Sequence, residues 1–419
     1  MVIASSTFPR RPGDAVPDFV MQQALVFKKI SPNLDVHVLA PHDAGAALVE
    51  DMQGLAVHRF RYFFPASMQR LAYPAILPNI RRSPLLAVQV PFFLAAEYVA
   101  TRRLIRRIRP HLIYSHWFLP QALACGFAAL RDGVSHAFTC HSSELALMRR
   151  VPFGGTLVRL IVDRAAAVTV VGTRQLEQLQ TFFSAVQWER IAHKVRTMPM
   201  GVVPVPDAAL GEGVRVLARS ALEIGDDGLL LFMGRLTAKK GVFCLLDAFC
   251  QLMETVPDVR LVIAGDGELK EAIGDRICAL GLTGRVTMVG HVIGEDKEHL
   301  LAAADIVVLP SVPGPLGDME GLPVVGLEAM QWGRVLVASS AAGMGDVAEP
   351  GRDYFEYPAS DGPALCRALA DALSLGTERL EVMRRSAMEK ASQYTWDALA
   401  PTYLEHLADQ GHEKGIDRH

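Results

Sequence analysis

The chain has 419 residues, of which half are hydrophobic and about a fifth are charged, and its formal net charge is −3. This balance excludes an intrinsically disordered chain, and the length allows two domains with large cores. Six cysteines without a Cys-x-x-Cys pair, and no secretory signal before residues 9–12, favour a reduced cytoplasmic protein without the usual zinc patterns.

The charge is divided unevenly along the chain. Residues 1–203 carry a net charge of about +11 and the remainder about −14. Either the two halves attract each other, or the basic half orients the protein on an anionic membrane or attracts an anionic acceptor. We favour a peripheral membrane surface. Nucleic acid is not expected as a partner, because the arginines lack interleaved aromatic residues.

One apolar stretch, residues 84–100, is flanked by arginines on both sides. It contains Gln89, Pro91 and Glu97, and it is shorter than the roughly 20 residues that a spanning helix needs. We therefore expect this segment to lie near a bilayer rather than across it, which suits a lipid-linked or amphipathic acceptor.

Apolar runs that read as strands alternate with helical stretches along the whole chain. Strands are expected at 36–40, 112–114, 137–139 and 167–171, and then at 229–233, 260–264, 286–289, 306–309 and 335–338. Continuous apolar strands between amphipathic helices predict two parallel α/β sheets, each covered on both faces. Ligands bind beyond the carboxyl ends of such strands, so the site is expected in a cleft between two domains.

The domain boundaries follow from the glycines and prolines of residues 201–206, which disfavour helix and central strand. We expect one domain over 1–203 and a second over 204–385. The remaining segment, 386–419, is expected to be helical and to pack back toward the first domain.

Polar residues follow several expected strands of the first half. Gly13 lies in the first strand-to-helix loop, where its backbone N–H can face a phosphate. His116 and His141 each come directly after a strand. A single histidine is more often a hydrogen-bonded structural residue, but His141 is followed by a polar loop and is the stronger candidate.

In the second half, a strand is followed by the stretch 234–241, which begins with Gly234 and contains Arg235 and Lys240. An arginine can bind phosphate oxygens in a bidentate manner, and a lysine adds a compact charge, so this stretch is a candidate diphosphate clamp. Gly265 opens a tight turn suited to close backbone approach, and the residues from Gly290 to Val292 are candidates for a base or ribose pocket.

Two glutamates lie close together in the stretch 318–330. Glu320 and Gly321 precede a segment, roughly 323–332, with helical apolar spacing, and Glu328 lies about two turns further on. A carboxylate and free backbone N–H groups at a helix start can hold hydroxyl or phosphate groups. The chain has no Asp-x-Asp pair that would hold a divalent ion with a nucleotide.

Taken in order, these pieces resemble the retaining glycosyltransferases of family 4, which have the GT-B fold of two Rossmann-like, doubly wound domains facing across a cleft. The matching pieces span nearly the whole chain: residues 7–14, 115–117, 139–141, 234–241, 265–267 and 320–330. The resemblance implies transfer of a hexose from a nucleotide-diphosphate sugar to an acceptor hydroxyl, with retention of anomeric configuration. It implies no cofactor and no catalytic metal.

The resemblance also implies roles for the candidate residues. Arg235 and Lys240 would hold the donor diphosphate, and Glu328 the ribose hydroxyls. Glu320, with the backbone N–H groups of Gly321 and Leu322, would hold the donor sugar. His141 would contact the sugar or the transition state, and Gly13 would let its loop approach the diphosphate.

The acceptor implied is a carbohydrate or a lipid-linked molecule of bacterial-type surface polysaccharide, lipopolysaccharide or glycolipid assembly. GDP-mannose and UDP-hexoses both remain possible donors. Two other functions are possible: a nucleotide-sugar 2-epimerase of the same fold, and an inactive subunit that binds sugar nucleotides. The epimerase is distinguished by donor turnover without an acceptor.

Overall fold

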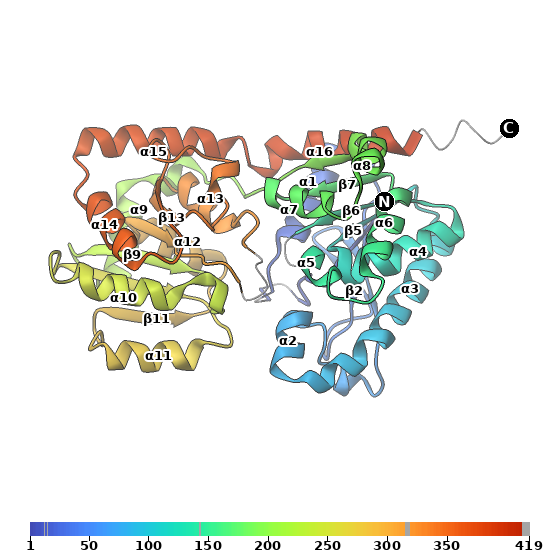
Figure 1. The fold of residues 1–419 in the computed structure, drawn as a ribbon, viewed down its shortest axis with the longest axis horizontal. Helices are drawn as coiled ribbons and strands as arrows, with labels where there is room; N and C mark the ends of the chain where they lie inside the picture. Colours follow the sequence, from blue (N-terminus) through green and yellow to red (C-terminus); the bar gives the residue numbers. More distant parts are fainter. Residues whose placement is uncertain (12, 15, 142–143, 315–318, 413–419) are drawn as a thin grey trace. The chain divides into compact units, whose positions relative to one another are not determined.

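The computed structural model describes residues 1–11, 13–14, 16–141, 144–314 and 319–412. The chain forms two compact units, which are described one at a time (Figure 1). Unit 1 comprises Met1–Met200 and Trp396–His419, and unit 2 comprises Gly201–Thr395. Pro12, in the first matching piece, and Ser142, in the polar loop after His141, lie outside the described residues.

Unit 1 is built on a sheet with the strand order β3-β4-β2-β1-β5-β6-β7-β8, in which only the β3–β4 pair is antiparallel. Its strands are β1 (Val2–Ala4), β2 (His37–Pro41), β3 (Val49–Met52), β4 (Leu55–Phe60), β5 (Leu112–His116), β6 (Ser135–Cys140), β7 (Ala167–Val170) and β8 (Val195–Thr197). Its α-helices are α1 (Phe19–Ile30), α2 (Ile76–Arg82), α3 (Gln89–Ile108), α4 (Leu123–Asp132), α5 (Glu144–Met148), α6 (Gly154–Arg164), α7 (Thr173–Gln180), α8 (Ala185–Ile191) and α16 (Trp396–His412).

Unit 2 has a parallel sheet with the order β11-β10-β9-β12-β13-β14. Its strands are β9 (Gly228–Met233), β10 (Val259–Ala264), β11 (Val286–Gly290), β12 (Ile306–Leu309), β13 (Val335–Ser339) and β14 (Phe355–Tyr357). Its α-helices are α9 (Glu212–Ala221), α10 (Val242–Leu252), α11 (Lys270–Ala279), α12 (Gly294–Ala303), α13 (Val324–Gln331), α14 (Gly362–Leu373) and α15 (Thr377–Ser392). All nine expected strands are present within one or two residues of their expected bounds.

Both faces of the unit 2 sheet are buried, and β9 shows how the sequence achieves this. Leu229, Leu231 and Met233 point into one hydrophobic cluster, whereas Leu230 and Phe232 point into the other. Alternate residues of a strand point to opposite faces, so a continuous apolar run is what a sheet between two helical layers requires.

Both sheets have a switch point, where strand order reverses. In unit 2 the chain moves outward from β9 to β11 and then returns to place β12 on the other side of β9. In unit 1 the corresponding reversal lies between β1 and β5. In doubly wound sheets the loops beyond the carboxyl ends of strands at such points form the ligand site.

The division of the chain differs from the expected boundaries at 203/204 and 385/386. The first crossing lies between Met200 and Gly201, and the second between Thr395 and Trp396. Residue 386 lies inside α15, a continuous helix of unit 2, so a boundary there would cut a hydrogen-bonded helix. Residues 386–395 therefore belong to unit 2, and α16 belongs to unit 1.

The helix α16 is held in unit 1 by buried aromatic side chains. Trp396 and Tyr403 are both buried, and the Tyr403 ring lies 6.2 Å from the Phe27 ring of α1. The Tyr403 hydroxyl also donates a hydrogen bond of 2.9 Å to the carbonyl of Met198. The end of the chain thus completes the core of the unit that the start of the chain forms.

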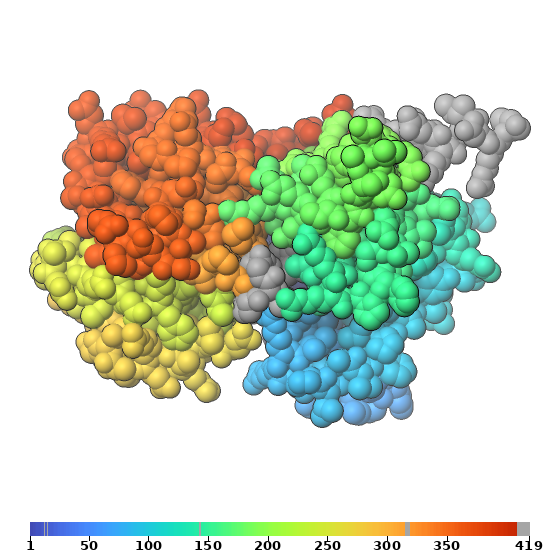
Figure 2. All heavy atoms as spheres, viewed as in Figure 1, coloured from blue at the N-terminus to red at the C-terminus, as the bar shows by residue number. Residues whose placement is uncertain are grey.

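The longest apolar helix of unit 1 begins with the 3-10 turn η2 (Pro84–Val88) and continues as α3. By length and composition alone, the segment Pro84–Ile108 is sufficient to cross a membrane. In the fold, α3 packs against α4: Arg102 pairs with Asp132 at 2.8 Å, and the Thr101 hydroxyl lies 3.3 Å from the Cys125 sulfur. In Figure 2, α2 and the first turns of α3 (blue) lie at the surface of unit 1.

Candidate active site

The loops after β9, β10 and β11 meet through backbone hydrogen bonds at the carboxyl edge of the unit 2 sheet. The Gly234 N–H donates to Ala264 O at 2.9 Å, and the Gly265 N–H donates to Gly290 O at 2.6 Å. A Cβ atom on Gly265 would lie 1.9 Å from Gly234 O, so only glycine fits there. The three glycines expected at the site are therefore adjacent, and they form its floor.

The loop from Gly234 to Gly241 approaches the end of β12 equally closely. The Val312 N–H donates to Lys239 O at 2.9 Å. Gly241 has a φ of +67°, and a Cβ atom there would lie 1.7 Å from Pro310 O. This contact fixes the position of the two lysines that precede Gly241.

Glu320 lies between the ammonium groups of those lysines. Its carboxylate oxygens are 3.0 Å from Lys240 Nζ and 3.2 Å from Lys239 Nζ, and its side chain is 11% exposed. Burial disfavours the charged form, but Lys240 and Lys239 outweigh it and lower the pKa of Glu320 to about 2. Glu320 is therefore a carboxylate at every ordinary pH, able to accept hydrogen bonds but not to donate a proton.

The expected sugar-binding backbone lies just beyond Glu320. Among the described residues, the N–H groups of Gly321 and Leu322 have no hydrogen-bond acceptor. Gly343 has a φ of +80°, and a Cβ atom on it would lie 2.1 Å from Gly321 O, so the loop after β13 supports this turn. Leu322 and Val292 pack against the same hydrophobic cluster. Arg235 is exposed, and its guanidinium lies within electrostatic reach of Glu320.

Glu328 lies in α13, as expected, but it has a partner that the sequence did not indicate. Lys297 of α12 places its Nζ 2.8 Å from the Glu328 Oε1. The two groups are 30% and 19% exposed, so both are open to solvent. Lys297 holds the carboxylate of Glu328 in one orientation at the edge of the loop that begins at Gly290.

In unit 1, His116 and His141 form a pair at the carboxyl ends of β5 and β6. His116 Nδ1 lies 3.1 Å from His141 Nε2, and the Trp117 ring lies 4.5 Å from the His141 ring. The backbone N–H of His141 donates to the Glu144 carboxylate at 2.5 Å, so that His141 is tied to the start of α5. Parallel pairing of β5 with β6 brings the two histidines together.

Both histidines are neutral, because burial lowers the pKa of His141 to about 3 and that of His116 well below its usual value. His116 Nε2 is buried and has no partner among the described residues. In protein interiors, a buried N–H group without an acceptor is rarer than a buried acceptor atom without a donor. The unpartnered Nε2 of His116 is therefore assigned as the unprotonated nitrogen. We therefore assign the proton of His116 to Nδ1, from which it donates to His141 Nε2. His141 then carries its own proton on Nδ1, as a hydrogen-bond donor.

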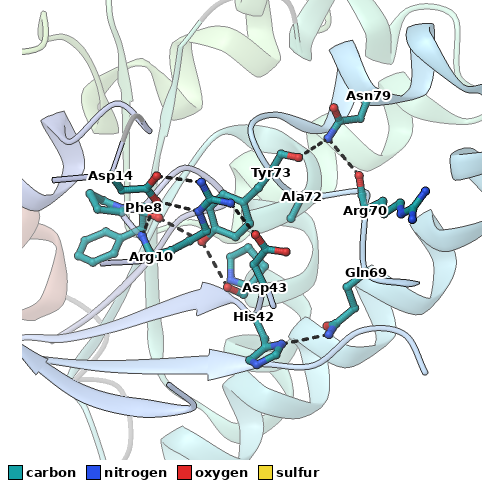
Figure 3. Close-up of polar contacts among 12 residues, drawn as sticks. Phe8, Arg10, Asp14, His42, Asp43, Gln69, Arg70, Ala72, Tyr73 and Asn79 are labelled. Carbon is teal, nitrogen blue, oxygen red and sulfur yellow. Dashed lines mark hydrogen bonds and ion pairs between the residues drawn. The ribbon is translucent and has the colours of Figure 1, made fainter. Parts of the chain in front are cut away.

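The loop that contains Gly13 is braced by Arg10 (Figure 3). The Arg10 guanidinium binds both carboxylate oxygens of Asp14 at 2.8 Å and reaches Asp43 at 2.6 Å. It also lies over the Tyr73 ring, 5.1 Å from its centroid. Gly13 has a φ of +73°, a conformation that favours glycine.

The fold thus groups the candidate residues within each unit. In unit 2 it brings together Gly234, Gly265 and Gly290 through backbone hydrogen bonds, and Arg235 and Lys240 with Glu320, which Gly321 and Leu322 follow. Glu328 is paired with Lys297, and Val292 packs against the same hydrophobic cluster as Leu322. In unit 1 it places Gly13 after β1, at the switch point, and His141 after β6, the neighbour of β5. Their roles stay predictions.

Three functional candidates were missed by sequence reasoning: Lys239, Lys297 and the partner role of His116. Lys239 is adjacent to Lys240, so the doubled lysine was a usable signal. Lys297 lies on a helix with no distinguishing pattern, and only its ion pair with Glu328 of α13 reveals it.

Two family models match the chain, one in each unit. The model described as Glycosyltransferase Family 4 matches residues 32–202, and the one described as Glycosyl transferases group 1 matches residues 227–374. The chain is also 30% identical over 280 residues to the alpha-maltose-1-phosphate synthase of Mycolicibacterium smegmatis, covering 63% of this chain and 68% of that protein.

Other relatives are matched over a smaller part of their length. An uncharacterized glycosyltransferase of Methanocaldococcus jannaschii is 30% identical over 210 residues, which is 49% of this chain and 52% of that protein. A putative colanic acid biosynthesis glycosyltransferase of Salmonella typhimurium is 31% identical over 201 residues, which is 47% of this chain and 50% of that protein. The chain thus spans about half the length of these two relatives.

Solved structures agree on the fold. Sucrose-phosphate synthase from Thermosynechococcus elongatus has a TM-score of 0.71 at 19% identity, covering 96% of this chain and 97% of that one. Anabaena HepE in complex with UDP-glucose has a TM-score of 0.66 at 17% identity, covering 97% of this chain and 99% of that one. The chain belongs to glycosyltransferase family 4, among the glycosyl transferases group 1, and has the two-domain α/β fold known as GT-B.

Proposed function

We propose that the protein transfers a hexose from a nucleotide-diphosphate sugar to an acceptor hydroxyl, with retention of anomeric configuration and without a metal ion. The observation that carries the proposal is the cluster of Arg235, Lys239, Lys240 and Glu320 at the switch point of unit 2. Membership of the family and the UDP-glucose bound to HepE support the choice of donor.

The charge of this cluster suits a leaving diphosphate. Arg235, Lys239 and Lys240 carry three positive charges against the carboxylates of Glu320 and Glu268, so the cluster keeps a net positive charge of about +1 toward the two negative charges of a sugar diphosphate ester. When the glycosidic bond breaks, the departing nucleoside diphosphate gains a further negative charge. Cations already fixed in place therefore stabilise the transition state more than the bound donor, which is the condition for catalysis.

The carboxylates of unit 2 have separate roles in this proposal. Glu320, ionised and held by two lysines, accepts hydrogen bonds from hydroxyls of the donor sugar, while the N–H groups of Gly321 and Leu322 donate to them. Glu328, held by Lys297, accepts hydrogen bonds from the ribose diol. The loop from Gly290 to Val292 lies beside the base, and Gly13 beside the diphosphate.

His141 is proposed to donate its Nδ1 proton as a hydrogen bond to the sugar that is transferred. A neutral imidazole can do this throughout the ordinary pH range, because the pKa of His141 lies at about 3. The proposed acceptor is a carbohydrate or lipid-linked molecule of surface polysaccharide or glycolipid assembly, a choice supported by the Salmonella relative, a putative colanic acid biosynthesis glycosyltransferase. The proposed location is the cytoplasmic face of the membrane.

The first experiment is a thermal-shift screen of the purified protein against UDP, GDP, ADP and their common sugar conjugates, with and without EDTA. We expect stabilisation by one nucleotide family, unchanged by EDTA. Stabilisation that EDTA abolishes contradicts the metal-independent site. Consumption of the donor without any acceptor, with formation of an epimer, supports a 2-epimerase instead.

Lys240→Ala tests the clamp directly. We expect turnover to fall by about 10²–10³-fold, because one preorganised electrostatic donor contributes roughly 3–4 kcal/mol to such a transition state. The measurement is initial-rate kinetics with the identified donor. Lys390→Ala in α15 is the control, because it also removes one lysine from unit 2. Near-normal turnover of Lys240→Ala, with a normal thermal transition, refutes the clamp.

A further inference from the structure

The segment from η2 to the end of α3 has an unusual distribution of polarity between its two faces. The buried face begins with Gln89, Phe93, Glu97 and Thr101. The exposed face carries Leu85, Val88, Phe92, Ala95 and Val99, which we call the apolar stripe. Leu104 and Ile105 continue the buried face further along α3. An ordinary surface helix carries polar side chains on its exposed face, whereas the first half of α3 carries apolar ones there.

The members of the apolar stripe are open to solvent to a degree that is rare for large apolar side chains. Leu85 is 82% exposed, Val88 61% and Phe92 53%. The spacing 85, 88, 92, 95 and 99 follows the helical repeat, so these residues form one line along the helix. Phe64, 91% exposed, extends the same region, since its neighbour Phe63 packs edge-on against Phe92 with centroids 5.4 Å apart.

The buried face cannot rotate outward to hide the stripe. The Gln89 amide donates to Met68 O at 2.8 Å, Arg102 pairs with Asp132 at 2.8 Å, and the Phe93 ring packs 5.2 Å from the Phe60 ring. Glu97 is fully buried and burial raises its pKa to about 8. The stripe therefore stays on the outside while α3 stays attached to α4.

Positive charge surrounds the apolar stripe. Residues 61–109 contain nine arginines and one carboxylate, Glu97, which is buried. Arg81 and Arg82 precede the stripe, and Arg103 continues its exposed face; none of the three is ion-paired with a described residue. A line of apolar side chains with basic residues at both ends matches an anionic membrane surface, in which acyl chains lie beneath phosphate groups.

We propose that the apolar stripe and its flanking arginines dock unit 1 on an anionic lipid bilayer, with α3 lying in the plane of the interface. A second copy of this chain fits the surface poorly, because two such surfaces would bring arginines against arginines with no exposed carboxylate to balance them. A nucleic acid would satisfy the arginines but would leave Leu85, Val88 and Phe92 without a partner. The inference does not depend on the proposed transferase activity.

The test is vesicle flotation of the full-length protein with phosphatidylglycerol-rich vesicles and with vesicles of phosphatidylcholine alone. We expect binding to the anionic vesicles that weakens as salt is added, because exposed charge pairs are screened. Two double variants, Leu85→Ser with Phe92→Ser and Arg81→Ser with Arg82→Ser, should each weaken that binding at least tenfold. Their thermal transitions should stay normal, since the altered side chains are exposed.

Matched controls on the same unit are Val186→Ser, at a site that is 78% exposed in α8, and Arg131→Ser with Arg150→Ser. Both should bind vesicles like the parent protein. A Phe92→Trp variant should also show a blue shift of emission on anionic vesicles, and a Val186→Trp variant should show none.

Several outcomes overturn the proposal. Unchanged vesicle binding by the Leu85/Phe92 variant excludes the stripe as the docking surface. A dimer of the parent that this variant converts to a monomer identifies a second copy as the occupant. Tight binding to RNA that depends on Arg81 and Arg82 but not on Leu85 and Phe92 identifies a nucleic-acid surface instead.

Discussion

At the scale of single residues, the fold sets the ionisation states on which the proposed chemistry depends. Glu320 is buried yet ionised, because two lysines surround it. His141 and His116 are neutral, because nothing offsets their burial. Burial removes hydration from a charged group in both cases. A buried group stays charged where opposite charges lie next to it and becomes neutral where none does.

His116 is a positioning residue in this account, and its effect on His141 can be measured. We expect His116→Leu to remove the hydrogen bond to His141 Nε2, so that His141 populates both tautomers and transfer falls at least tenfold. His116→Asn should restore the single tautomer of His141 and the transfer rate, because the side-chain amide N–H of asparagine lies near the position of the histidine Nδ1 and can donate the same hydrogen bond. Nitrogen chemical shifts of His141 report the tautomer independently of activity, and an unchanged tautomer in His116→Leu contradicts the assignment.

Glu97 makes stability depend on pH in a defined direction. Burial raises the pKa of Glu97 from 4.5 to about 8 in the folded protein. Between these two pH values the folded protein keeps the Glu97 proton, whereas the unfolded chain releases it. Stability is therefore lost as pH rises between these two values.

Relative to the parent protein, Glu97→Gln should gain roughly 3–4 kcal/mol of stability between pH 5 and pH 8, because glutamine has no proton that the unfolded chain can release over this range. Chemical denaturation at both pH values measures this. Glu189→Gln, exposed on α8, is the matched control and should show no such pH dependence. An equal effect of Glu97→Gln at both pH values would show that Glu97 does not ionise in this range.

At the scale of elements, the site of unit 2 depends on loops that pack backbone against backbone. Gly241, Gly265 and Gly343 each lie where a Cβ atom would fall 1.7–2.1 Å from a carbonyl oxygen. These contacts hold four loops at one edge of the sheet, so that the lysines of the loop after β9 converge with Glu320 of the loop after β12.

Gly241→Ala tests this close packing. We expect destabilisation by more than about 2 kcal/mol, because the substitution combines a left-handed φ with a steric overlap against Pro310 O. Gly274→Ala in α11 is the control: nothing lies within 4 Å of its Cβ, and helix propensity predicts a gain of about 0.5–1 kcal/mol. Equal effects of the two substitutions in thermal unfolding would contradict the argument.

At the scale of the whole molecule, each unit has its own sheet and its own hydrophobic clusters, but unit 1 is assembled from two distant parts of the sequence. Its last helix contributes Trp396, Ala400, Tyr403 and Leu407 to the interior. Unit 2, by contrast, is a single continuous segment.

Deletion of residues 396–419 should therefore damage one unit and spare the other. We expect unit 1 to lose its cooperative thermal transition, because the apolar face of α1 around Phe27 becomes exposed. Unit 2 should keep its own transition and its stabilisation by nucleotide. Calorimetry with and without the nucleotide separates the two, and an undisturbed transition of unit 1 would show that α16 is dispensable for its core.

The sequence by itself determined the fold class, nine of the fourteen strands in the described residues and the position along the chain of the main candidate residues. Continuous apolar runs, glycine turns and charged residues directly after strands are local features, and parallel sheets gather everything that follows a strand at one edge. For that reason Arg235, Lys240, Glu320 and Glu328 could be named without coordinates.

Other properties depend on residues far apart in the sequence, and only the tertiary structure decided them. It paired Glu320 with Lys239, Glu328 with Lys297, and His116 with His141. It moved the last boundary to Trp396, because α15 continues through residue 386. It also left Val88, Phe92 and Val99 exposed while it buried Gln89, Glu97 and Thr101. Helical periodicity identifies two faces, but the neighbours that pack against a helix determine which face is buried.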